Sequence, residues 1–104
     1  DMGVLAIGVD SNQNYMQPGT MLTSMYKKVG LAAYNSFAAA VNGTWQAGFS
    51  VNGVAEDGVG AAMDEYNADL VSADMLAAVN SARDAIISGD IVVHDYMSDN
   101  SCPL

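Results

Sequence analysis

A short apolar run near the start of the sequence, Val4 to Val9, ends at Asp10. It shows no polar alternation, which is typical of a strand buried on both faces within a parallel sheet. Such a strand needs neighbouring strands on both sides and a packed layer on each face. The remaining elements that 104 residues can form do not supply all of these. We therefore interpret the sequence as a piece of a larger α/β protein.

The first half of the chain predicts one more strand and one helix. A polar loop over 11–20 leads to a second strand at 21–26, and no helix fits between the two strands. Over 31–41 apolar side chains recur at three- and four-residue steps, which predicts an amphipathic helix. Gly43 can take the left-handed conformation that ends such a helix.

The second half predicts a hairpin and a second long helix. Residues 45–51 alternate between apolar and polar side chains, which predicts a half-buried strand, and a return strand is predicted at 59–63. Ser72 is a suitable N-cap for a helix that runs to Ser88. A short extended segment over 91–93 is predicted before the polar tail.

The charge of the chain disfavours several classes of function. Twelve Asp and Glu residues stand against three Lys and Arg, for a formal net charge of −9. A phosphate backbone or an anionic lipid surface would be repelled, so we predict no nucleic-acid partner. No apolar run approaches the roughly 20 residues of a membrane span, and any signal peptide would lie upstream of this chain. Cys102 is alone, so no internal disulfide and no cysteine metal cluster are predicted.

Several short motifs follow one another in a specific order. They are IGVDSNQ (7–13), PGT (18–20), LTSMYKKV (22–29), GVGAA (58–62), DEYN (64–67) and IISGDI (86–91). In this order they resemble the motifs of the basic membrane protein family. Members of that family are lipoprotein receptors of ABC-type transporters, and they include the purine-nucleoside receptors of spirochaetes. The similarity covers Ile7 to about Met97.

The resemblance implies a type I periplasmic-binding fold, in which two α/β lobes joined by three crossing strands close on a ligand. This chain would be its C-terminal part. Residues 1–28 would form strands of the C-terminal lobe, and 30–43 a helix that packs on the N-terminal lobe. Residues 44–97 would return to the C-terminal lobe, and 98–104 would form a frayed tail.

The resemblance also implies the partners and the location of the protein. The ligand would be a nucleoside, of the purine class, handed to the permease of an ABC transporter, and no cofactor is implied. The protein would be an extracytoplasmic lipoprotein of the cell membrane, with its signal peptide and anchor outside this chain. The isolated chain would leave a bare sheet edge and apolar faces, so we expect it to self-associate.

Asp10 is the first candidate binding residue. A carboxylate just beyond the carboxyl end of a parallel strand lies where open α/β sheets bind ligands. Its two acceptor oxygens match the two vicinal hydroxyls of a ribose. An equally good explanation from the residues alone is that Asp10 starts the turn through Ser11 and Asn12, a common role of Asp. The resemblance favours the ligand role.

Lys27 is the second candidate. Successive side chains of a strand point to opposite faces, so Lys27 and Lys28 do not both face one cleft. The resemblance aligns the lysine of the family with Lys27, which would donate to ribose hydroxyls or pair with Asp10, and leaves Lys28 solvated. Without the resemblance, a surface role for both lysines is the simpler interpretation. Asn12 departs from the Asp that the family usually has, which removes one negative charge near the site.

The sequence favours binding over catalysis. It shows no Ser-His-Asp set, no metal-ligand cluster and no phosphate-binding glycine loop before a helix, so we predict no catalytic residues, no metal and no enzyme activity. The function that the resemblance implies is capture of a nucleoside for an ABC transporter. The alternative is a ligand-sensing regulatory or signalling protein on the same fold.

Overall fold

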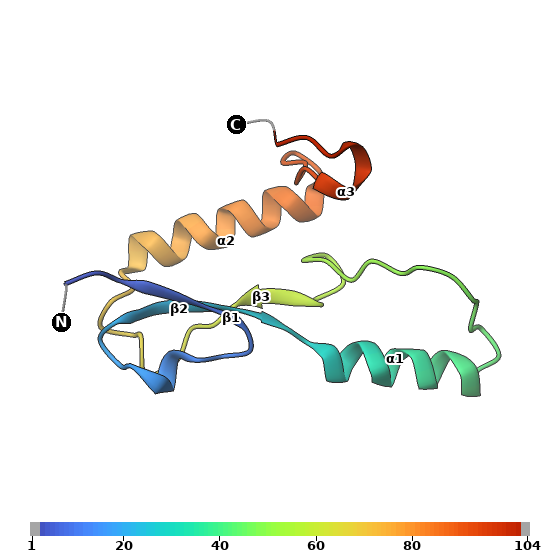
Figure 1. Ribbon diagram of the computed structural model, residues 1–104, viewed down its shortest axis with the longest axis horizontal. Helices are drawn as coiled ribbons and strands as arrows, with labels where there is room; N and C mark the ends of the chain where they lie inside the picture. Colours follow the sequence, from blue (N-terminus) through green and yellow to red (C-terminus); the bar gives the residue numbers. More distant parts are fainter. Residues whose placement is uncertain (1–2, 103–104) are drawn as a thin grey trace.

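Three strands form one mixed sheet in the order β1-β2-β3. They are β1 (Ala6–Asp10), β2 (Met21–Lys27) and β3 (Val59–Ala61). The computed structural model describes residues 3–102, and Figure 1 shows the sheet with one long helix above it and another beyond its end. β1 runs parallel to β2, whereas β3 runs antiparallel to it. The predicted first two strands are therefore confirmed.

The connection between β1 and β2 contains one short helical turn. This is the 3₁₀ helix η1 (Asn14–Met16), which departs from the prediction of a loop alone. Parallel strands are usually joined by a crossover of a dozen or more residues that covers one face of the sheet. Here η1 takes that place, because Asn14 lies fully buried against Ser24 of β2.

The two faces of the sheet are covered differently. Gly8 and Ser24 are paired across β1 and β2 and face the η1 connection, and a Cβ at Gly8 would come within 2.5 Å of Ser24 Oγ. That close approach requires glycine. The opposite face lies below helix α2 (Ala73–Ser88), with a gap of about 380 Å³ lined by residues that include Ile7 and Val79.

Helix α2 has the predicted ends. The side chain of Ser72 accepts a hydrogen bond from the backbone N–H of Met75, and Asp74 lies in the first turn, where a negative charge favours the helix dipole. Gly89 follows the helix with a φ of 85°, the left-handed conformation that ends many helices. The extended segment predicted over 91–93 is not a strand.

Helix α1 (Val29–Val41) confirms the predicted amphipathic helix, and Gly43 ends it with a φ of 71°. Its start has no side-chain cap and no acidic residue in the first turn. The helix buries none of its residues, and Phe37 is 76% exposed. Figure 1 shows the reason, since α1 extends beyond the end of the sheet.

The strand predicted over 45–51 is wrong. The chain from 44 to 53 is irregular and runs back from the far end of α1 toward β3 without joining the sheet (Figure 1). β3 itself is the predicted return strand, but it pairs with β2. Trp45 is 58% exposed and Phe49 fully exposed. Alternation specifies a strand only where another strand and a buried face are available, and the described residues offer neither beside this segment.

Apolar burial is sparse. Among the described residues, only Met21 and Ala62 are buried hydrophobic side chains. β1 is an edge strand, with Ile7 61% exposed, so its predicted burial on both faces does not occur within this chain. The radius of gyration is 16.6 Å, against about 13 Å for a compact domain of this length. No helix in residues 3–102 combines the length and apolarity that a membrane crossing requires.

We expect the isolated chain to self-associate through the exposed apolar face of α1, because large apolar patches of this kind are rarely left in water. The double substitution Phe37→Ser and Val41→Ser should lower the mean mass measured by light scattering across a concentration series. Ala40→Ser, at an exposed position outside this face, should leave the mass unchanged. A wild-type chain that is monomeric throughout the series would contradict the expectation.

Candidate ligand-binding site

Asp10 and Lys27 lie side by side at one edge of the sheet. Each is the last residue of its strand, and parallel strands present their carboxyl ends at the same edge. Lys27 Nζ lies 2.6 Å from Asp10 Oδ1, with the two side chains 52% and 68% exposed. The structure therefore forms the ion pair that the sequence suggested. Binding of a ligand by this pair stays a prediction.

The backbone at Asp10 is in the left-handed region, with a φ of 73°. Asp is one of the few residues that tolerate this conformation, which still costs on the order of 1 kcal/mol. The conformation turns the chain sharply at the strand end and leaves the carboxylate outside. Asp10 thus starts the turn and also presents its carboxylate at the edge, so the two interpretations of this residue are compatible.

Lys28 is not simply solvated, contrary to the prediction. Its Nζ pairs with Asp57 Oδ2 at 2.5 Å and lies 5.8 Å from the centre of the Tyr26 ring. This hydrogen bond raises the pKa of Lys28 and lowers the pKa of Asp57. The backbone N–H of Lys28 also donates to Gly58 O at 2.8 Å. The two lysines therefore have separate acidic partners, and only Lys27 pairs with Asp10.

A buried polar cluster lies directly behind this edge. Ser24 Oγ donates to Asn14 Oδ1 at 2.7 Å and accepts from the backbone N–H of Gln13 at 3.0 Å. Asn14 Nδ2 donates to Ala62 O at 3.4 Å and to Asp64 Oδ2 at 3.2 Å. Both Asn14 and Ser24 are completely buried. The cluster joins the connection after β1, the central strand and the segment after β3.

Asn67 completes the cluster from the other side. Its Nδ2 donates to Leu22 O at 2.8 Å and to Ala62 O at 3.0 Å, and its Oδ1 accepts from the backbone N–H of Asp64 at 2.9 Å. Asn67 is 1% exposed. Every buried side-chain nitrogen and oxygen in residues 3–102 has a hydrogen-bond partner. The arrangement is therefore well specified, because an unpaired group at this depth would be costly.

Asn12 belongs to the same network. Its Nδ2 donates to Asp64 Oδ2 at 2.6 Å, while its Oδ1 accepts from the backbone N–H of Asn14 at 3.0 Å. The hydrogen bond from Asn12 is the largest influence that holds the pKa of Asp64 below its ordinary value, and the backbone N–H of Tyr66 and the amide of Asn14 act in the same direction. The amide at position 12 thus fixes the loop after Asp10.

The sequence did not reveal these cluster residues. The pattern places Asn14 in the polar loop, and it places Ser24 and Asn67 only within the motifs LTSMYKKV and DEYN. One signal was available, since Ser24 lies in the middle of an otherwise largely apolar strand. A polar residue buried in a strand needs a partner, but the sequence does not say which one.

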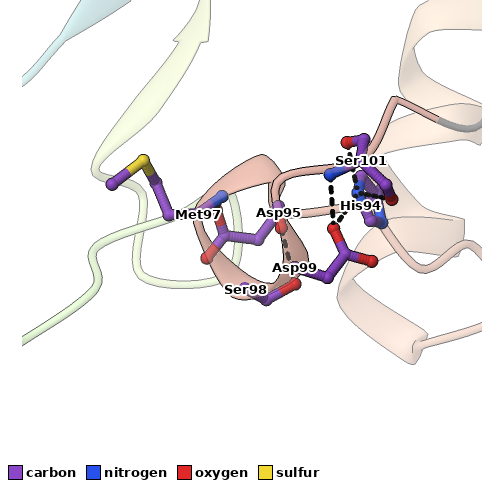
Figure 2. A network of polar contacts seen from close by, with 6 residues as sticks. All are labelled: His94, Asp95, Met97, Ser98, Asp99 and Ser101. Atoms are coloured by element: carbon purple, nitrogen blue, oxygen red, sulfur yellow. Dashed lines mark hydrogen bonds and ion pairs between the residues drawn. The ribbon is translucent and has the colours of Figure 1, made fainter.

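A serine, a histidine and an aspartate do come together in the C-terminal segment, around helix α3 (Tyr96–Asp99) (Figure 2). Asp99 Oδ1 lies 3.3 Å and Ser101 Oγ 3.4 Å from the same nitrogen of His94, Nε2. A catalytic relay needs the carboxylate on Nδ1 and the hydroxyl on Nε2. This group therefore has the wrong geometry for a nucleophile.

The same contacts hold the C-terminal segment in place. The backbone N–H of Ser101 donates to Asp99 Oδ1, and this hydrogen bond is the largest cause of the lowered pKa of Asp99. The backbone oxygen of Ser101 lies 3.0 Å from His94 Nε2. The segment from Ser98, for which the sequence predicts a frayed tail, makes these contacts as far as Ser101. Cys102 is an exposed free thiol, and no set of three potential metal ligands occurs within residues 3–102.

Comparison with known proteins gives consistent results. A family model, Bmp, described as ABC transporter substrate-binding protein PnrA-like, matches residues 1–96. Uncharacterized lipoproteins from Pyrococcus abyssi and Pyrococcus horikoshii are each 38% identical to the chain over 56 residues. That match covers 54% of this chain and 14% of each lipoprotein.

A solved structure shows the fold. The crystal structure of an ABC transporter system solute-binding protein from Aeropyrum pernix K1 matches 90% of this chain with a TM-score of 0.62 and 21% sequence identity. The chain therefore has the α/β fold of a solute-binding protein. It spans 34% of that solved relative.

Loss of the Ser24 hydroxyl should destabilise the chain. Ser24→Ala leaves the oxygen of Asn14 and the N–H of Gln13 without this partner, so the free energy of unfolding in urea should fall by about 1–3 kcal/mol. The matched control is Ser36→Ala, which removes an exposed hydroxyl from α1 and should change the same quantity by no more than about 0.5 kcal/mol. Equal effects of the two substitutions would show that the buried cluster does not stabilise the fold.

Proposed function

Because the chain belongs to the Bmp family of PnrA-like ABC transporter substrate-binding proteins, we propose that a whole protein carrying it captures a purine nucleoside for an ABC transporter. The chain spans only about a third of the solved relative, so the proposal concerns a two-lobed protein of which this is one part. The matched lipoproteins of Pyrococcus support an extracytoplasmic location, with the lipid anchor outside this chain.

The observation that carries the proposal is the exposed Asp10–Lys27 pair at the carboxyl edge of β1 and β2. An ionised carboxylate accepts several hydrogen bonds, and an ammonium group has three N–H donors, so each keeps capacity beyond the ion pair. The pair fixes the direction of both groups. Together they offer acceptors and donors to adjacent hydroxyls, the pattern that a ribose presents.

The exposure of the pair also supports a shared site. A ligand site usually encloses most of its ligand, and an edge this open does not do so. In the proposed arrangement the N-terminal lobe closes over the edge and supplies the aromatic groups that contact the base. The exposed apolar face of α1, residues 29–41, would pack against that lobe, with residues 1–28 and 44–97 in the C-terminal lobe.

A site of this kind would select for intact ribose. A hydrogen-bonding group that loses its partner on binding of a deoxy analogue is left desolvated and unpaired, which gives strong discrimination. The family favours binding without turnover, so we propose no enzymatic step. A ligand-sensing regulatory or signalling protein on the same fold is the alternative, and it would use the same ligand site.

We expect Asp10→Ala in the two-lobed protein to weaken nucleoside binding on the order of 100-fold, because two hydrogen bonds to a charged group are lost. Calorimetry with inosine, guanosine, adenosine and their 2′-deoxy forms measures this. Asp84→Ala removes the same charge from the exposed surface of α2 and should bind as wild type does.

Three results would count against parts of the proposal. Equal binding by wild type and Asp10→Ala removes Asp10 from the site. Conversion of the nucleoside during the titration favours an enzyme. Nucleoside uptake that is unaffected in cells lacking the protein, despite tight binding in vitro, favours the regulatory alternative.

A further inference from the structure

The carboxylate of Asp64 lies at the meeting point of two segments far apart in the sequence. Its Oδ2 accepts hydrogen bonds from Asn12 Nδ2 at 2.6 Å and from Asn14 Nδ2 at 3.2 Å. Both asparagines belong to the connection that follows Asp10. One oxygen thus gathers two side chains of the loop that begins with the proposed ligand-binding residue.

Asp64 is itself held firmly in place. Its Oδ1 accepts from the backbone N–H of Tyr66 at 2.9 Å, and its own N–H donates to Asn67 Oδ1 at 2.9 Å. Asn67 is buried and donates to Leu22 O on the central strand at 2.8 Å. The carboxylate therefore has a fixed position relative to β2, the strand that carries Lys27.

The loop after Asp10 needs such a fixed point. Asp10 has left-handed backbone geometry, which persists only where the surroundings hold it. On one side its carboxylate is paired with Lys27. On the other side, two residues along, the exposed Asn12 is held by Asp64. Without that acceptor, the amide of Asn12 would keep only its bond from the backbone N–H of Asn14, which lies within the same loop.

We propose that Asp64 is a positioning residue of the ligand site, which acts through Asn12 and Asn14 to hold Asp10 in its binding direction. The inference rests on the proposed role of Asp10 and adds a residue that has no contact with that carboxylate. The hydrogen bond from Asn12 is the first cause of the lowered pKa of Asp64, the direction expected when a donor stabilises an ionised carboxylate.

The substitution Asp64→Asn tests the proposal with little change of shape. An amide has one oxygen, so it can accept either from Tyr66 or from the two asparagines, but not from both. Nucleoside affinity of the two-lobed protein should fall by about tenfold, the loss of one hydrogen bond to a charged group. Exchange of the backbone N–H of Asn14 with deuterium should become faster. Asp69→Asn removes the same charge from an exposed position of the same turn and should change neither quantity.

A charge swap separates positioning from general stability. Combining Asn12→Asp with Asp64→Asn keeps the net charge and reverses the bond between these two positions, since the amide at position 64 then donates to the carboxylate at position 12. The bond from Asn14 Nδ2 is not restored, because two N–H donors then face each other. The affinity should return to within about threefold of wild type, as should the exchange of the Asn14 N–H. If Asp64 contributes only to stability, Asp64→Asn should lower the melting temperature, and the double variant should not recover the affinity or the exchange of the Asn14 N–H.

The outcomes distinguish the inference from the proposed function. If Asp64→Asn has the nucleoside affinity and the Asn14 N–H exchange of wild type, the inference is overturned. The proposed function still stands in that case, provided that Asp10→Ala binds nucleoside more weakly than wild type. If the wild-type protein binds no nucleoside, the proposed function is wrong. The inference about Asp64 is then tested only by the exchange of the Asn14 backbone N–H. Faster exchange that the swap reverses supports positioning, and unchanged exchange overturns it.

Discussion

Hydrogen bonds made by the buried side chains of Asn14, Ser24 and Asn67 connect the sheet to its loops where apolar packing is sparse. Within residues 3–102, these three side chains are the largest that are fully buried, and Met21 and Ala62 are the only buried apolar residues. A group at this depth that lost its partner would cost about 1–3 kcal/mol, so the loops that carry these side chains have one favourable arrangement. Polar groups thus provide the specificity that a larger hydrophobic core usually gives.

At the candidate site, the two neighbouring lysines pair with different acidic residues. The chain carries a formal charge of −9, yet Lys27 and Lys28 each have one acidic partner, Asp10 and Asp57. Lys27 ends β2 and Lys28 lies between β2 and α1, and the two ammonium groups have different partners, so the pairs do not compete. The Lys28 pair ties the end of β2 to the turn before β3. The Lys27 pair stands at the exposed edge, where exposed pairs contribute little stability and are open to a ligand.

The spacing of apolar residues predicted the helices and strands that are specified by their own sequence. It was wrong for the strand over 45–51, which would need a neighbouring strand to pair with. β1, β2, α1 and α2 follow from their own residues, and Asp10 meets Lys27 because parallel strands end at one edge. The alternation over 45–51 gave no strand, since nothing in the described chain pairs with it. The cluster around Asn14 was beyond prediction for another reason. Its bonds to Ala62 and Asp64 span 48 and 50 residues, and no spacing rule connects such distant polar groups.

The residues that shape the half-site all lie between positions 10 and 67, so its geometry is internal to this chain. The loop after Asp10 turns the carboxylate of Asp10 outward and the amide of Asn14 inward, and Asp64 closes the loop through Asn12. An aspartate at position 12, as the resembling family usually has, would bring two carboxylates together unless one held a proton. In this chain Asn12 avoids that repulsion, because its amide donates to Asp64. The exposed apolar surfaces of β1 and α1 have no such internal solution within residues 3–102, whereas the direction of Asp10 is set by residues of this chain.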